Sequence, residues 1–154
     1  MSTQHDHLLD LKTRELRTIV GSVEARTSGD EPNGRPTEIT GYASLFETPA
    51  TIAGQFVEII ERGAFDIEDA DVRVLFNHDP SLLLGRTKSG TATLAVDDRG
   101  LRYAVQIPPT SLGRDLAALV ARGDVDGSSF GFRVMSDRWE PGATAEDLPV
   151  RHVE

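Results

Sequence analysis

The sequence feature that most constrains the fold is a hairpin pattern in residues 91–107, TATLAVDDRGLRYAVQI. Apolar residues alternate with polar ones through Leu94 and Val96, and the alternation resumes at Leu101 after a polar turn. A period of two predicts strands with one buried face, and Gly100 is expected to supply the positive φ of a short hairpin loop. The chain is therefore expected to build an antiparallel sheet around this hairpin.

Several other short segments have strand-like sequences, and turns rich in Gly, Pro and Asp separate them. Gly41 interrupts one of these segments and indicates a β-bulge. In chain order, the segments are residues 14–26, 37–47, 56–60, 71–77, 128–135 and 150–153.

One amphipathic helix is predicted after residues 108–109, which are both proline. Its apolar residues recur at helical spacing and form one face, made of Leu112, Leu116, Leu119 and Val120. Thr110 or Ser111 can cap its start, and Gly123 can end it. Many short strands with one helix favour a mainly β barrel or sandwich with helices packed outside.

The composition is that of a single folded domain without a membrane segment or a signal peptide. The chain has 154 residues, of which 38% are hydrophobic and 27% are charged, and no apolar run approaches the roughly 20 residues of a membrane span. Residues 1–12 are polar and are expected to form a flexible arm, which leaves residues 13–154 as one domain. The N-terminal sequence lacks the basic and apolar regions of a signal peptide, so a cytosolic protein is expected.

Charge and cysteine content exclude several functions. The formal net charge is −9, which argues against non-specific binding to nucleic acid or to anionic lipid, since both require a positive surface. The absence of cysteine removes disulfides, thiolate zinc sites and cysteine nucleophiles. The sequence also lacks an H-E-x-x-H motif, and residues 67–71 lack the glycine and spaced oxygens of a calcium loop. Neither a metal nor a cofactor is therefore expected.

Residues 127–131, GSSFG, match the G-x-S-x-G pattern of the nucleophile elbow in α/β-hydrolases. That motif needs a strand before the serine and a helix after it, whereas here the predicted helix comes first and a strand follows. Few residues of this sequence follow Ser129, too few for the downstream acid and histidine of that fold. The α/β-hydrolase interpretation is therefore rejected.

A second arrangement of serine and histidine remains. Hydrolysis of an amide by serine needs a base within hydrogen-bond reach of the hydroxyl and a third group that orients the base. His78 follows an apolar segment, and Pro80 predicts a turn that places this imidazole at a strand edge. Ser129 and His152 supply the other two residue types. From residue types alone, a surface histidine and a turn serine are the more frequent explanation.

A series of short motifs runs through roughly residues 38–134. They are GYA at 41–43 with Phe46, ERGAF at 61–65, VLFNHDP at 74–80, LGR at 84–86, DRGL at 98–101, the helix at 111–123, and DGSSFGF at 126–132. In this order along the chain, they resemble the motifs of the prohead (capsid maturation) proteases of tailed bacteriophages, serine peptidases related in fold to herpesvirus assemblin. The combination of N-H-D-P, L-G-R, D-x-G-L and S-F-G-F at these intervals is specific.

The resemblance implies a mainly β fold, with an assemblin-like barrel core and helices packed outside, and it also implies site residues. His78 would be the base and Ser129 the nucleophile, because the serine of the family directly precedes an apolar residue, Gly and Phe. His152 is expected as the third member of the triad, since assemblins use a second histidine in a strand of similar sequence. Glu154 is the alternative, because phage relatives can use a carboxylate in this region.

The resemblance further implies a role in phage assembly. The expected substrates are the major capsid protein, the scaffold and the chain itself, inside the assembling procapsid in the host cytoplasm, and a homodimer is left open. The family usually continues with another strand pair where this chain stops at Glu154, so a truncated or self-processed chain is expected. The alternative function is a non-catalytic capsid-assembly or scaffold-binding β domain, in which His78 and Ser129 serve only the fold. An esterase is a third hypothesis.

Overall fold

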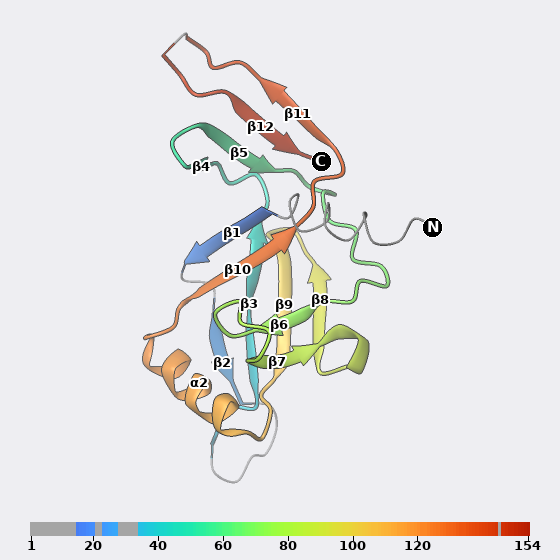
Figure 1. The fold of residues 1–154 in the computed structure, drawn as a ribbon, viewed down its shortest axis with the longest axis vertical. Coiled ribbons are helices and arrows are strands. Elements are labelled where there is room, and N and C mark those ends of the chain that lie inside the picture. Colours follow the sequence, from blue (N-terminus) through green and yellow to red (C-terminus); the bar gives the residue numbers. More distant parts are fainter. Residues whose placement is uncertain (1–14, 21–22, 28–33, 145) are drawn as a thin grey trace, which may run out of the picture.

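The computed structural model describes residues 15–20, 23–27, 34–144 and 146–154, and Figure 1 shows how they are arranged. The predicted arm of residues 1–12 lies outside the described residues. Strands dominate the described part of the chain, as the sequence predicts, and one α-helix and one short 3₁₀ helix (Thr87–Ser89) accompany them. No helix in these ranges is long and apolar enough to cross a membrane.

The strands of the described residues form two sheets of four strands and two ribbons of two strands. The first sheet contains, in spatial order, β2 (Glu24–Arg26), β3 (Glu38–Leu45), β9 (Gly100–Gln106) and β8 (Ala92–Val96). The second contains β11 (Asp137–Glu140), β12 (Val150–Val153), β5 (Phe56–Ile60) and β4 (Ala50–Ile52). The ribbons pair β1 (Glu15–Val20) with β10 (Gly127–Phe132), and β6 (Arg73–Leu75) with β7 (Leu83–Arg86).

The mainly β class is therefore confirmed, but the predicted barrel is not. These sheets do not close on themselves within the described residues. In place of several flanking helices, this part of the chain has the single α-helix α2 (Ser111–Arg122).

The predicted hairpin of β8 and β9 is confirmed, but the reason for its glycine differs from the prediction. The side chain of Asp97 accepts hydrogen bonds from the backbone N–H groups of Arg99 and Gly100, at 2.8 and 3.1 Å. Gly100 is not among the described glycines with positive φ. A Cβ atom at this position would collide with the backbone oxygen of Ser44 in β3, so glycine is needed because two strands approach closely here.

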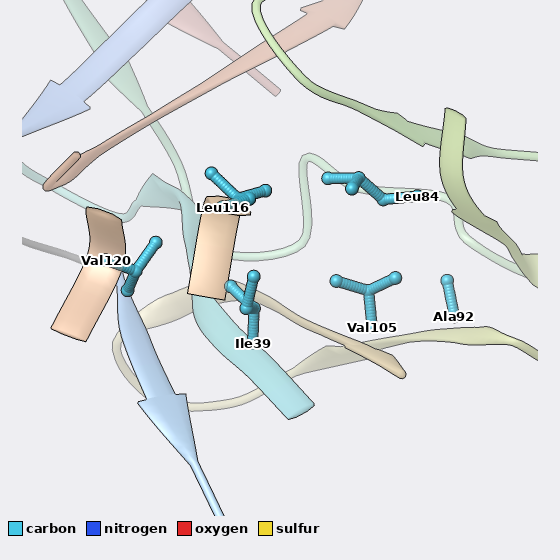
Figure 2. Packing of buried hydrophobic residues seen from close by; sticks show 6 residues of the cluster. All are labelled: Ile39, Leu84, Ala92, Val105, Leu116 and Val120. Carbon is cyan, nitrogen blue, oxygen red and sulfur yellow. The ribbon is translucent and has the colours of Figure 1, made fainter. Parts of the chain in front are cut away.

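Helix α2 begins and ends as the sequence predicts. The hydroxyl of Thr110 accepts a hydrogen bond from the backbone N–H of Gly113 at 3.2 Å, and Gly123 ends the helix in the left-handed conformation with a φ of 79°. One face of the helix packs on the first sheet, and Figure 2 shows the two helical side chains beside residues of β3, β7, β8 and β9. The buried residues of this core are Ile39, Leu84, Ala92, Val105, Leu116 and Val120.

Three further predictions need correction in detail. The bulge in β3 lies between Tyr42 and Ser44 rather than at Gly41. The strand predicted in residues 71–77 is limited to β6. Residues 14–26 contain two strands, β1 and β2, which belong to different sheets.

A second apolar cluster joins the β1–β10 ribbon to the sheet that contains β12. Its buried members are Phe46, Ile60 and Val153, and the partly buried Phe65 and Phe132 pack against them. Phe130 stacks on Phe132 with ring centroids 4.8 Å apart, because residues two apart in a strand share a face. By the same alternation, Ser128 shares this face of β10 with the two phenylalanines, and Ser129 lies on the opposite face.

Candidate active site

Strand β10 carries two adjacent serines on opposite faces, because successive side chains of a strand alternate. Ser128 is buried, with only 8% of its surface exposed, and its hydroxyl oxygen lies 2.7 Å from that of Tyr103 on β9. Burial raises the pKa of Tyr103, so its phenol stays neutral at ordinary pH. Ser129 is half-buried on the other face. Ser128 is therefore packed against β9, whereas Ser129 is accessible.

The hydroxyl of Ser129 is hydrogen-bonded to strand β1. Thr18 lies directly opposite Ser129 in the antiparallel β1–β10 pair, and the two hydroxyl oxygens are 2.6 Å apart. Directly opposed residues of a ribbon project from the same face, so this contact follows from the register. Sequence reasoning missed Thr18, because nothing local indicates that two residues 111 positions apart pair across a ribbon.

His78 lies in the turn between β6 and β7, three residues after β6 ends at Leu75. Its imidazole is exposed, and no described residue forms a hydrogen bond with it. The carboxylate of Asp79 supports the turn by accepting hydrogen bonds from the hydroxyl and the backbone N–H of Ser81, at 2.6 and 2.8 Å. These bonds lower the pKa of Asp79.

The backbone at His78 is strained. Asn77 and His78 both adopt the left-handed conformation, with φ values of 52° and 56°. A residue other than glycine in this region costs about 1–3 kcal/mol, and such residues are concentrated at functional sites. The strain at two successive residues marks this turn as a functional candidate.

His152 lies in the middle of a sheet, where β12 pairs with β11 on one side and β5 on the other. Its Nδ1 atom is buried and lies 2.8 Å from Oε1 of Glu61, although the two groups are not aligned for a hydrogen bond. Its Nε2 atom lies 3.6 Å from Oε2 of Glu140. His152 therefore contacts carboxylates rather than a serine or a second histidine.

Glu154, the alternative third member, is exposed and interacts with neighbouring strands. One carboxylate oxygen lies 3.4 Å from Nε of Arg138, and the other accepts a hydrogen bond from the Ser136 hydroxyl at 3.3 Å. Arg138 also forms ion pairs with Glu61 and Glu140, so both candidates belong to one charged group around β12. In the part of the chain that the structure describes, no group of three or more histidine or carboxylate side chains is arranged to hold a metal ion.

The predicted triad is not joined by hydrogen bonds in this structure. Among the described residues, Ser129 bonds to Thr18, and His152 contacts two carboxylates, while His78 has no bonded partner. Figure 1 shows the β1–β10 ribbon between the sheet that carries β12 and the β6–β7 hairpin that carries His78. The assignment of these residues to one active site stays a prediction.

Comparison with known families adds a finding that the geometry alone does not supply. A model of the caudovirus prohead serine proteases matches residues 22–154. The chain belongs to this family. No curated protein and no solved structure matches the chain significantly, so the relation to herpesvirus assemblin stays a prediction.

In this prohead protease family member, the matched residues include β10 and the turn of His78, but not β1. A serine protease needs a serine that a substrate can reach, and Ser129 meets this requirement better than the buried Ser128. Thr18, the hydrogen-bond partner of Ser129, lies outside the matched residues.

A group of charges around the buried Glu58 was also not predicted from the sequence. Glu58 on β5 is 3% exposed and accepts hydrogen bonds from Arg17 at 2.5 and 2.7 Å and from Arg151 at 3.3 Å. Arg151 also pairs with Glu15 at 2.9 Å and with Asp137 at 2.7 Å. We call these five residues the charge cluster. It connects β1 of the ribbon to three strands of the second sheet, and hydrogen bonds to Glu58 help to raise the pKa of Arg17.

Proposed function

We propose that the protein is a serine endopeptidase that acts in the maturation of phage procapsids. The observation that carries this proposal is the family match, which extends over residues 22–154. Ser129 would be the nucleophile, because it is the accessible serine of β10. His78 would be the general base, and its exposed position in a strained turn supports that role.

In the proposed mechanism, His78 accepts the proton of the Ser129 hydroxyl while the oxygen attacks the carbonyl carbon of the scissile peptide bond. The imidazolium then donates this proton to the leaving amine, and water releases the acyl group with the help of the same base. Backbone N–H groups near Arg86 or after the serine would stabilise the oxyanion. In this structure, Ser129 is bonded to Thr18 and not to His78. This is compatible with the mechanism, because catalytic hydrogen bonds often tighten only when substrate binds.

His152 is proposed as the residue that orients His78, with Glu154 as the alternative. Each now contacts other charged residues, so either would have to exchange those partners to reach the base. His152→Gln and Glu154→Gln separate the two assignments. The orienting residue is the one whose substitution slows cleavage while the other variant stays active.

The proposed substrates are the major capsid protein, the scaffold and the chain itself. The proposed place of action is the assembling procapsid in the host cytoplasm, where the local concentration of substrate is high. The proposal includes no cofactor, nucleic acid or membrane, and it allows a homodimer.

The decisive experiment compares Ser129→Ala with the adjacent Ser128→Ala. Each variant is co-expressed with capsid protein and scaffold, and mass spectrometry identifies the cleaved junctions. Ser129→Ala is expected to abolish cleavage while circular dichroism shows an unchanged fold, and His78→Ala is expected to do the same. Ser128→Ala is expected to cleave the same junctions, because Ser128 packs against Tyr103 away from the proposed site. Equal cleavage by Ser129→Ala and the unmodified protein would refute the assignment.

One observation favours a second candidate, a non-catalytic capsid-assembly or scaffold-binding domain. No hydrogen bond joins Ser129 to either candidate histidine among the described residues. A fluorophosphonate probe, which reacts with activated serines, separates the two functions. Labelling of Ser129 supports a hydrolase, and turnover of peptides rather than only small esters then separates a peptidase from an esterase.

A further inference from the structure

Strand β1 brings a second hydroxyl to the proposed nucleophile. The oxygens of Thr18 and Ser129 lie 2.6 Å apart, and the two residues are direct partners in the ribbon. Thr18 is exposed, so its hydroxyl stays on the accessible face of the ribbon together with that of Ser129. The strand that supplies it lies outside the residues matched to the family.

We propose that Thr18 is a positioning residue that holds the Ser129 hydroxyl in the orientation needed for attack. This inference rests on the proposed function. A hydroxyl has one proton to donate and two lone pairs that can accept. Because Ser129 must give its own proton to the base, Thr18 is the donor in the reactive state.

The chemistry of the attack is compatible with this hydrogen bond. Thr18 donates to one lone pair of Ser129, and the other lone pair forms the bond to the carbonyl carbon. The Ser129 proton passes to His78, and the π electrons of the carbonyl move to its oxygen, which becomes the oxyanion. The Thr18 hydrogen bond uses none of these groups, so it can persist while the serine reacts.

The charge cluster holds in place β1, the strand that carries this hydroxyl. Arg17 and Glu15 project from the opposite face of β1 to Thr18, because side chains alternate along the strand. Arg17 is bonded to the buried Glu58, and Glu15 to Arg151. A positioning residue is effective only when its own strand is held in place, and these bonds hold β1 against the second sheet.

The experiment compares substitutions that remove or keep the hydroxyl. Thr18→Val replaces the hydroxyl by a methyl group at nearly constant volume. Thr18→Ala removes the hydroxyl without putting a methyl group in its place, and Thr18→Ser keeps it. Thr93→Val is the matched control, because Thr93 is also exposed on a strand but lies on β8, in a different sheet from Ser129. Labelling by the fluorophosphonate probe is measured at several probe concentrations, and peptide cleavage gives kcat and KM separately.

Thr18→Val and Thr18→Ala are each expected to lower the maximal labelling rate and kcat about tenfold, the effect of one lost hydrogen bond, with KM unchanged. Thr18→Ser should restore both rates, and Thr93→Val should change neither. The rates should keep the same pH profile, since the base is untouched.

Labelling of both hydroxyl-free variants at the unmodified rate would overturn the inference, and so would a failure of Thr18→Ser to restore it. Ser129→Ala serves as the reference for the proposed function. If Ser129→Ala is inactive while the Thr18 variants are fully active, only the role of Thr18 is lost. If the unmodified protein neither labels nor cleaves, the proposed function fails first.

Discussion

Replacing Glu58 by glutamine tests whether the charge cluster fastens the β1–β10 ribbon to the second sheet. Glu58 is 3% exposed and accepts three hydrogen bonds from the guanidinium groups of Arg17 and Arg151. Glutamine keeps the shape of the side chain but removes its charge, and its NH₂ group cannot accept a bond from a guanidinium. The two arginines would then lie near a neutral, partly mismatched partner in a buried position.

The magnitude follows from what remains of the cluster. Removal of one member of a buried ion pair costs about 3–5 kcal/mol, because the other charge stays buried without compensation. Here Arg151 keeps Glu15 and Asp137 as partners, and Arg17 keeps Glu15. The expected loss in the free energy of unfolding is therefore at the lower end, about 3 kcal/mol. For a domain of this size, that loss lowers Tm by about 6–12 °C.

Urea unfolding, followed by tryptophan fluorescence, measures this loss with a probe that lies beside the charge cluster. Trp139 is the single tryptophan of the chain, and its ring centroid lies 5.6 Å from the Arg151 guanidinium carbon. Glu24→Gln is the matched control, because its ion pair with Arg26 is exposed and should contribute nothing measurable. A loss below about 1 kcal/mol in Glu58→Gln, or one no larger than in the control, would refute the reasoning.

Two further predictions concern the first sheet. Gly100→Ala should lower the free energy of unfolding by about 1–3 kcal/mol, because the added Cβ atom collides with the backbone of Ser44, and an unchanged melting temperature would contradict this. Burial raises the pKa of Tyr103, so the folded state favours the neutral phenol. That contribution is fully present below the ordinary tyrosine pKa of about 10 and is lost as the pH rises through the higher pKa of the folded state. The free energy of unfolding should therefore fall more steeply at alkaline pH in the unmodified protein than in Tyr103→Phe. Tyr42 is present in both proteins and contributes equally to both. An equal pH dependence of the two proteins would contradict the prediction.

The hairpin and the helix were predictable from the sequence because both depend on nearby residues. Alternation on either side of a polar turn is enough to predict the pairing of β8 with β9, and the structure has this pairing. Thr110 and Gly123 limit α2 by bonds within a few positions of the chain. Periodicity and capping act over short distances, so neither needs knowledge of the rest of the fold.

The arrangement of the strands was not predictable in the same way. Residues of β1 and β2 are close in sequence but lie in different sheets, and the predicted barrel is not found among the described residues. The sequence predicts a positive φ at Gly100, and this prediction is wrong, because glycine is needed there for the close approach of Ser44, more than fifty positions earlier. The packing of whole sheets decides which strands pair, and the periodicity of a single segment carries no information about its partner strand.

The same distinction between local and long-range information applies to the candidate site. The sequence by itself determined the residue types, the family motifs and the turn around Pro80, all of which are local. Only the tertiary structure decided that Ser128 is packed against Tyr103 and that Ser129 faces the accessible side with Thr18. The physical reason is that alternation assigns two residues to opposite faces but does not say which face is buried, and that is decided by the neighbours that fold against the strand.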